Sequence, residues 1–331
     1  MSITTTKKKW KTLRKRLVLG ILAFLLLFAV IPYSIPLSYY DGHKLPYENS
    51  SHFEASGSSI HYRSYVPLQE PVKGKILLVH GMGGSTFSYE KNAPALASQG
   101  YYVVAVDLPG FGYSSRLVDE NHAQSYRASS LWLLLDYLDA NVFTQDEPMQ
   151  QWHLAGHSMG GGTVAAMSRL NENRVASVVF IDGALFETNG GSSSLLSFPI
   201  VQRWVQVLLE HVIIKPKRFE SFLRSAYGQP PEDFQIQGYY DPLSIGGTAR
   251  SAPALIRTAK NIDESELTLI KIPALAIWGK NDTWVPLSEI NRIQSYIPQL
   301  EISVINGAAH CPMETHPEEF NTRLLDWLSN F

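Results

Sequence analysis

The chain has 331 residues, 45% of them hydrophobic and 18% charged, so it is globular and holds enough apolar material for one large domain or two small ones. Its single cysteine, Cys311, excludes an internal disulfide framework and a metal site made of several cysteines. The net charge of -2 is unevenly distributed: residues 1–16 carry seven basic groups and no acid, which leaves -9 on the remainder and argues against a nucleic-acid partner for the body.

The N-terminal segment joins this basic tail to an apolar run. Residues 17–31 are apolar without interruption, and the uncharged stretch continues to residue 37. At ~1.5 Å per helical residue, this length comes close to crossing a bilayer core of ~30 Å. A cleaved secretory signal is the alternative, although no pair of small residues at cleavage spacing follows Ile31.

We therefore expect a basic cytoplasmic tail (1–16) followed by a membrane anchor or uncleaved signal (17–37). The positive charge before the apolar run favours a single-pass anchor with the body on the non-cytoplasmic side, whether periplasmic, extracellular or lumenal. Secretion after signal cleavage is the alternative, and it exports the body as well.

From about residue 45 the chain alternates short apolar runs with helical patterns and shows no internal repeat. Strands are expected at 75–80, 101–107, 152–155, 175–182, 273–278 and 301–306. Helices are expected at 125–140, 159–170, 287–296 and 317–328. Because most of these strand candidates are apolar nearly throughout, they suit a sheet that is buried on both faces. The order predicts the α/β class, with a mostly parallel central sheet flanked by helices.

Residues 186–267 break the alternation. A glycine and serine stretch is followed by an amphipathic helical pattern over 200–212 and then by scattered aromatic residues. We predict a helical cap that is inserted between two parts of the core, 45–185 and 268–331, and that covers the ends of the strands. Most of its apolar residues are expected to pack inside the protein.

A serine lies between two glycines in the sequence Gly-His-Ser-Met-Gly at 156–160, after a predicted strand and before a predicted helix. Glycine at both flanking positions suits a turn in which backbones approach too closely for side chains. The turn presents the hydroxyl of Ser158 at the N-terminus of the helix. This motif is typical of a nucleophile elbow, and here the chain resembles the α/β-hydrolase family, in its capped branch of serine esterases and lipases.

The resemblance implies a catalytic triad in the chain order serine, acid, histidine. An acyl-transfer serine needs a base to take its proton and an acid to orient that base. Asp282 follows the predicted strand 273–278 in a loop like that of the family, and His310 follows the last predicted strand. We expect Ser158, Asp282 and His310 to form the triad. Asp182 ends the preceding strand, where some relatives carry the acid, and is the alternative.

The resemblance also implies donors for the oxyanion that develops on the attacked carbonyl. Residues 80–84 read His-Gly-Met-Gly-Gly after a predicted strand, like the family's loop that supplies one backbone N–H. Met82 and Met159 are the expected donors, through the backbone. The loop lacks the spacing of a nucleotide-binding motif. Asp107 opens a D-x-x-G-x-G-x-S turn and is expected to be structural.

The predicted activity is hydrolysis of a carboxylic ester through an acyl-enzyme. A membrane tether with an amphipathic cap suggests a lipid-like ester, such as a monoacylglycerol, as the small-molecule substrate. Carbon-carbon bond hydrolases, lactonases, proline aminopeptidases and cofactor-free peroxidases share the scaffold and the serine triad, so they are alternatives. A receptor that binds a ligand without turnover is an alternative of a different class.

No metal or organic cofactor is implied, because the histidines lack ligand spacing and there is no cysteine pair. His316 is expected to help start the terminal helix. His153 is expected to be structural, and His157 to point away from the position where Ser158 reacts.

Overall fold

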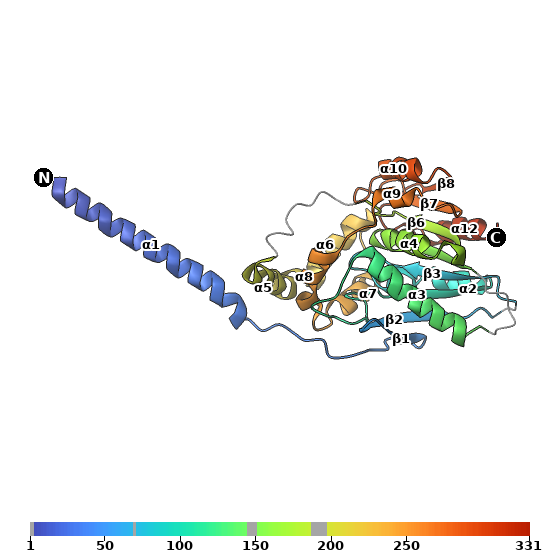
Figure 1. Cartoon of the computed structure of the whole chain (residues 1–331), viewed down its shortest axis with the longest axis horizontal. Coiled ribbons are helices and arrows are strands. Elements are labelled where there is room, and N and C mark those ends of the chain that lie inside the picture. The colour runs from blue at the N-terminus through green and yellow to red at the C-terminus, as the bar shows by residue number, and fades with distance from the viewer. Residues whose placement is uncertain (1–2, 69–70, 144–150, 187–196) are drawn as a thin grey trace.

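The computed structural model describes residues 3–68, 71–143, 151–186 and 197–331 (Figure 1). In this part of the chain the strands form one eight-stranded sheet in the order β1-β2-β4-β3-β5-β6-β7-β8. The strands are β1 (Ser50–Ala55), β2 (Ser58–Tyr65), β3 (Gly74–Val79), β4 (Tyr101–Val106), β5 (Trp152–His157), β6 (Val175–Ile181), β7 (Ala274–Gly279) and β8 (Leu300–Ile305).

The neighbouring strands from β4 to β8 are all parallel, whereas β1 pairs with β2, and β2 with β4, in antiparallel fashion. The prediction of a mostly parallel sheet is therefore confirmed. The antiparallel β1 and β2 were not anticipated. Their residues mix polar and charged side chains with apolar ones, so they lack the continuous apolar runs that mark the central strands.

Helices surround the sheet (Figure 1). Before β6 they are α1 (Ile3–Ser34), η1 (Thr86–Tyr89), α2 (Ala93–Ser98), α3 (Gln124–Asn141), α4 (Met159–Leu170) and η2 (Glu172–Arg174). Between β6 and β7 they are α5 (Pro199–Leu208), η4 (Leu209–Ile213), α6 (Pro216–Tyr227), α7 (Asp233–Leu243), α8 (Thr248–Thr258) and α9 (Glu264–Leu267). After β7 they are α10 (Ser288–Tyr296), α11 (Pro312–Thr315) and α12 (Pro317–Leu328).

The sheet separates two hydrophobic cores, because successive side chains of a strand point to opposite faces. In β3, Leu77 and Val79 pack with α3, α4 and α10, while Ile76 and Leu78 pack with α2 and α12. The strands are thus buried on both faces, as their apolar sequences predicted.

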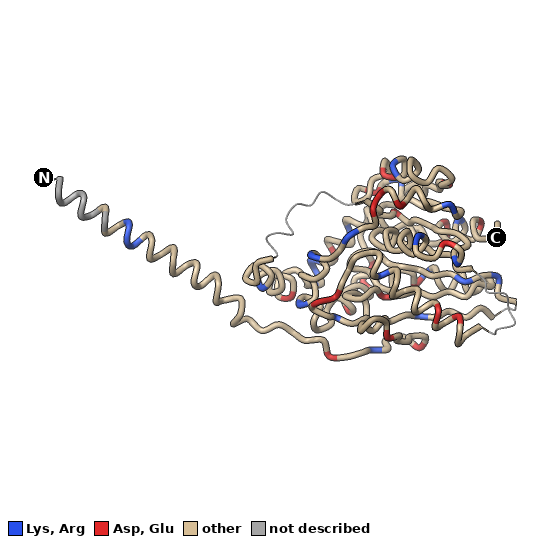
Figure 2. Tube along the Cα trace, in the orientation of Figure 1, with Lys and Arg blue, Asp and Glu red and all other residues tan. Residues whose placement is uncertain are grey.

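The N-terminal helix α1 extends away from the body (Figure 1). Its segment Thr12–Ser34 has 23 residues and is long and apolar enough to cross a membrane, and an 18-residue window within it has a mean hydropathy of 2.5. Only 6% of this window is buried, whereas a core helix would be mostly buried. No charged residue lies between Arg16 and Asp41 (Figure 2). The helix includes described residues of the basic tail, so tail and apolar run form one continuous element.

The helices between β6 and β7, from α5 to α9, occupy the segment in which the sequence predicted a cap. We call them the cap helices. The amphipathic pattern over 200–212 forms α5 and the π-helical turn η4. Of these helices, α5 lies at the end of the body where α1 joins it (Figure 1). The predicted glycine and serine stretch falls within 187–196, outside the described residues.

Candidate active site

Ser158 lies at the junction of β5 and α4, with a backbone φ of 49° and ψ of −119°. A positive φ is rare for a residue with a side chain and is found where a turn is forced. A Cβ added to Gly156 would lie 2.2 Å from the oxygen of Gly160, and one added to Gly160 would lie 2.3 Å from the oxygen of Val79. Only glycine therefore fits on either side, and the sharp turn leaves Ser158 at the N-terminus of α4.

The ring of His310, which follows β8, is joined to Asp282, which follows β7. Nδ1 of His310 lies 2.7 Å from Oδ2 of Asp282, and both side chains are buried. The other oxygen of Asp282 accepts hydrogen bonds from the N–H groups of Trp284 and Val285. Burial opposes ionisation of Asp282, but the hydrogen bond and the charge of His310 lower the pKa of its carboxyl below the ordinary value. The structure thus brings the predicted acid and base together.

Asp182, the alternative acid, lies beside this pair. One carboxylate oxygen of Asp182, one of Asp282 and a ring nitrogen of His310 all lie within 4.8 Å of one another. The Oδ1 atom of Asp182 accepts a hydrogen bond of 3.0 Å from the N–H of Gly279, while its buried Oδ2 finds a partner among the described residues only when it carries a proton and donates it to Asp282. Burial and the charge of Asp282 raise the pKa of Asp182 well above its ordinary value. The raised pKa favours a proton on Asp182, and this proton can be donated to Asp282.

Two aromatic side chains hold His310 in place. The ring of His157 lies 4.8 Å from that of His310, and its Nε2 bonds the backbone oxygen of His310 at 2.7 Å. Burial, and then the nearby His310, lower the pKa of His157 to about 3, so it is a neutral hydrogen-bond donor. On another side, the ring of Trp284 lies 5.1 Å from that of His310 and its Nε1 donates to Ser225 of α6. Sequence reasoning missed Trp284, whose only signal is its position two residues after Asp282.

The loop after β3 lies against Ser158. A Cβ on Gly81 would lie 2.9 Å from the Cβ of Ser158 and 2.8 Å from Nδ1 of His157. Met82 follows in this loop, and Met159 begins α4. Among the described residues, the backbone N–H groups of Met82 and Met159 have no hydrogen-bond acceptor. Met82 and Met159 therefore stay the predicted oxyanion donors.

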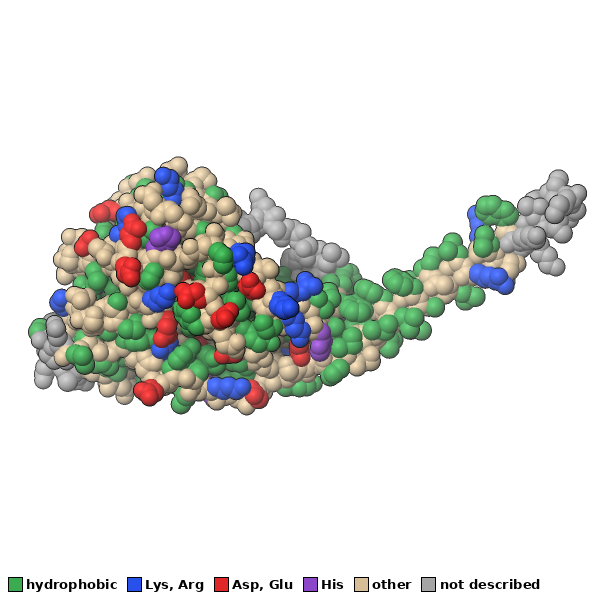
Figure 3. All heavy atoms as spheres, turned by 180° about the vertical axis from the view of Figure 1, so that it is seen from behind, with side chains coloured by type: hydrophobic (Ala, Val, Ile, Leu, Met, Phe, Trp, Pro, Cys, Tyr) green, Lys and Arg blue, Asp and Glu red, His purple; other side chains and the backbone are tan. Residues whose placement is uncertain are grey.

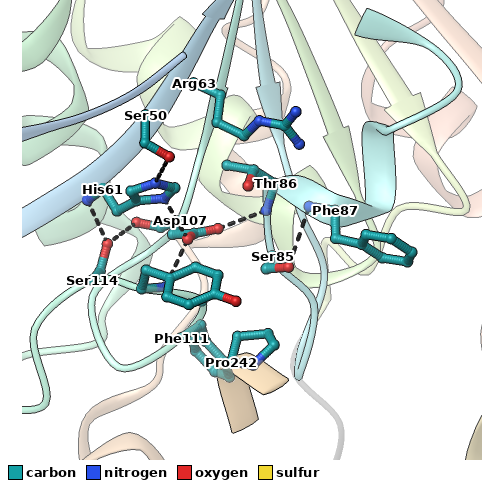
Figure 4. A network of polar contacts seen from close by, with 12 residues as sticks. Ser50, His61, Arg63, Ser85, Thr86, Phe87, Asp107, Phe111, Ser114 and Pro242 are labelled. Carbon is teal, nitrogen blue, oxygen red and sulfur yellow. Dashed lines mark hydrogen bonds and ion pairs between the residues drawn. The ribbon is translucent and has the colours of Figure 1, made fainter. Parts of the chain in front are cut away.

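Asp107 fixes the loop after β3 to the turn after β4 (Figure 4). Its carboxylate accepts hydrogen bonds from Thr86 N–H at 2.6 Å and Tyr113 N–H at 2.7 Å, and it bonds Nδ1 of His61 at 2.7 Å. Burial opposes ionisation, but the charge and hydrogen bond of His61 lower the pKa of Asp107. A Cβ on Gly112 would lie 1.9 Å from the carboxyl carbon, which explains the glycine of this turn. Asp107 takes the structural position that its motif predicted.

A cavity of about 380 Å³ extends from the loop after β3 to the cap helices. Its lining includes Met82, Phe111, Leu209, Ile213, Phe219 and Leu255. The ionisable side chains that line it are His122 and Arg218. Burial, and then the charge of Arg127, lower the pKa of His122 to about 3, so its imidazole is neutral. A ligand in this cavity would meet an apolar surface with one cation, and the cavity is large enough for a small organic molecule.

Residues 75–317 match the family model described as alpha/beta hydrolase fold. The chain belongs to this family. The match covers most of the sequence and includes Ser158, Asp282 and His310. The family and fold that the nucleophile elbow predicted are therefore confirmed.

Several hydrolases are similar to this α/β hydrolase. A 2-hydroxy-6-oxononadienedioate/2-hydroxy-6-oxononatrienedioate hydrolase of Pseudomonas putida is 27% identical over 265 residues, which cover 77% of this chain and 87% of the relative. A thermophilic esterase from Thermogutta terrifontis has a TM-score of 0.66 at 19% identity, covering 85% of this chain and 98% of the other. A membrane phospholipase A has a TM-score of 0.64 at 23% identity, covering 96% and 100%. Hydrolysis is the class of reaction that these relatives support.

Asp182, Asp282 and His310 are also the described residues of this α/β hydrolase whose ligand atoms lie close enough to hold a metal ion. Nδ1 of His310 is already bonded to Asp282, and a single proton on Asp182 suffices to let the two carboxyl groups lie side by side. A proton shared between the two carboxyl groups is consistent with this cluster.

Proposed function

We propose that the protein is a serine hydrolase in which Ser158 is the nucleophile, His310 the base and Asp282 the residue that orients the base. The observation that carries this proposal is the hydrogen bond between Nδ1 of His310 and Asp282. When Nδ1 carries the proton and donates it to the carboxylate, Nε2 is left as a proton acceptor. The hydrogen bond between a catalytic serine and its base often tightens only with substrate present.

The reaction then proceeds in two halves. His310 takes the proton of Ser158 as the serine oxygen attacks a carbonyl carbon, and the N–H groups of Met82 and Met159 stabilise the negative oxygen. The imidazolium is stabilised by Asp282 and returns its proton to the leaving group. Water, deprotonated by the same imidazole, then attacks the acyl-enzyme and releases the acid.

We propose a carboxylic ester with an apolar acyl group as the substrate. The lining of the cavity supports this choice, because leucine, isoleucine and phenylalanine side chains favour a hydrocarbon chain. The runner-up is the hydrolysis of a carbon-carbon bond, which the name of the Pseudomonas putida relative favours. That relative's substrate is a dicarboxylate. Two carboxylates would need pairing groups in a buried site, and Arg218 is the one cation of this lining.

The expected result is that kcat/KM increases with acyl length, by up to about fourfold per methylene while the chain still gains buried surface. The measurement compares acetyl, butyryl and octanoyl esters of one alcohol, with the full chain in detergent below its inhibitory concentration. Ala252 lines the cavity, and Ala252→Phe places a larger side chain inside it. This variant should therefore reduce octanoyl hydrolysis at least tenfold and leave acetyl hydrolysis nearly unchanged. A preference for acetyl esters would contradict the apolar acyl group, and faster cleavage of an oxononadienedioate would favour the runner-up.

We also infer that α1 is a retained anchor and that the body lies on the non-cytoplasmic side. The seven basic residues before the apolar stretch support this orientation. Protease added outside to bacterial spheroplasts should digest the body of the full chain, and the same protease should spare it in inverted vesicles. A cytoplasmic marker protein is the control, with the opposite pattern. Digestion only in inverted vesicles would reverse the orientation, and a free body in the medium would indicate cleavage.

A further inference from the structure

The helix α1 contains a proline within its apolar stretch, and a cap helix compensates for it. Pro32 has no N–H, so the oxygen of Phe28, four residues earlier, loses its partner in the helix. An unpaired carbonyl is costly inside a bilayer. The indole Nε1 of Trp204 in α5 donates a hydrogen bond of 2.9 Å to this oxygen, and the Trp204 ring stacks on that of Phe28 with centroids 5.4 Å apart.

The same cap segment also binds the chain where α1 ends. Arg203 donates to the oxygens of Pro32 at 2.9 Å and Ile35 at 2.5 Å, and Nε2 of His211 in η4 bonds the oxygen of Pro36 at 2.9 Å. Helix C-termini leave carbonyl groups without partners inside the helix. Side chains of α5 and η4 therefore pair oxygens at the end of α1 as well as the one freed by Pro32.

These contacts set the depth of α5. Phe28 lies six residues before Ser34, the last residue of the apolar stretch. At ~1.5 Å per residue this distance is about 9 Å along the helix axis. The uncharged part of the helix, residues 17–34, is about 27 Å long by the same measure, close to the ~30 Å of a hydrocarbon core. If this stretch crosses the bilayer, Trp204 reaches the level of the acyl chains.

The surface of α5 and η4 is suited to that depth. Large apolar side chains here are exposed to 60% at Phe198, 45% at Leu208, 39% at Val212 and 50% at Ile213. Hydrophobic side chains follow the anchor helix to the place where it meets the body (Figure 3). An amphipathic helix with such a face lies in a membrane interface when a bilayer is available. The occupant of this surface is therefore the lipid bilayer that holds α1.

The segment η4 also forms a wall of the cavity, because Leu209, Ile213 and Ile214 line it. We propose that α5 and η4 are embedded in the outer part of the bilayer beside the anchor, and that an acyl chain passes laterally from the bilayer across η4 into the cavity. The second half of this proposal rests on the proposed ester hydrolase function. The first half does not.

Site-directed fluorescence tests the embedding. Leu208→Cys and Val212→Cys, each in a Cys311→Ser background, are labelled with bimane in the full chain reconstituted in phosphatidylcholine vesicles. Lipids with a doxyl group on the acyl chain should quench both labels, and aqueous iodide should quench them weakly. Ile302→Cys in β8, 44% exposed, is the matched control and should show the opposite pattern. Iodide quenching at 208 and 212 equal to that at 302 overturns the embedding.

Kinetics tests the lateral passage separately. The double variant Leu208→Glu/Val212→Glu changes two exposed residues that do not line the cavity. Hydrolysis of a long-chain ester dissolved in the vesicles should fall at least tenfold, and hydrolysis of a water-soluble butyrate ester should stay within twofold. If the double variant leaves the ratio of long-chain to butyrate hydrolysis unchanged, the acyl chain does not pass laterally across η4. Absence of both activities in the wild type would instead contradict the proposed function, and the quenching result would stand independently.

Discussion

Ser158→Ala should reduce kcat/KM for the hydrolysed ester by roughly 10⁴- to 10⁶-fold, because removal of the nucleophile leaves only the binding site and the oxyanion donors. Alanine keeps a small side chain at the turn between β5 and α4, and Gly156 and Gly160 are unchanged, so the variant should fold. Ester turnover by the purified full chain measures the loss. An active-site-directed fluorophosphonate should label the wild type and leave the variant unlabelled.

Ser129→Ala is a suitable control, since Ser129 is exposed on α3 and donates only to the backbone oxygen of Ser125. It should keep wild-type turnover and labelling. Labelling that persists in Ser158→Ala would place the nucleophile elsewhere. A folded wild type that neither turns over nor is labelled would favour the receptor that binds its ligand without chemistry.

The second large effect distinguishes the role of Asp282 from that of its neighbour Asp182. Asp282→Asn should reduce kcat by on the order of 10⁴-fold, because the amide no longer supplies the charge that orients and stabilises the imidazolium of His310. Asp182→Asn should reduce kcat by less than about tenfold, because a neutral amide resembles the protonated acid that the raised pKa of Asp182 favours. The asparagine oxygen can still accept the N–H of Gly279, and its NH₂ can donate to Asp282.

The pKa of the Asp282 carboxyl adds a readout that a merely structural role of Asp182 would not move. In the wild type the hydrogen bonds from His310 and Asp182 lower the pKa of Asp282. Asp182→Ala removes one donor, so the pKa of Asp282 should rise, and an NMR titration of the Asp282 carboxyl should show its midpoint at higher pH than in the wild type. Strong loss in Asp182→Asn with activity retained in Asp282→Asn would make Asp182 the orienting acid.

The elbow could be predicted from the sequence because its cause is local. Gly156 and Gly160 are required by close backbone contacts around one turn, and the strand and helix on either side have clear patterns. Asp282 and His310 could be proposed because each follows a buried strand, and parallel strands bring their carboxyl ends to one edge of the sheet.

Other parts of the site depend on contacts between distant segments. The raised pKa of Asp182 follows from its complete burial next to Asp282, which lies 100 residues further along the chain. The packing of Trp284 on His310 and its bond to Ser225 require the cap to be in place. No spacing or periodicity marks such pairs, so sequence patterns left Asp182 as a rival acid and did not single out Trp284.

The dependence of α5 on the N-terminal helix bears on how the enzyme should be produced. A soluble fragment that begins after residue 37 would retain the elbow, but Arg203, Trp204 and His211 would lose the oxygens they bond. Their freed donors and the bare apolar helix would then face water, which invites self-association through the cap. Kinetic measurements on such a fragment would describe a protein whose cap helix α5 lacks its contacts with the N-terminal helix.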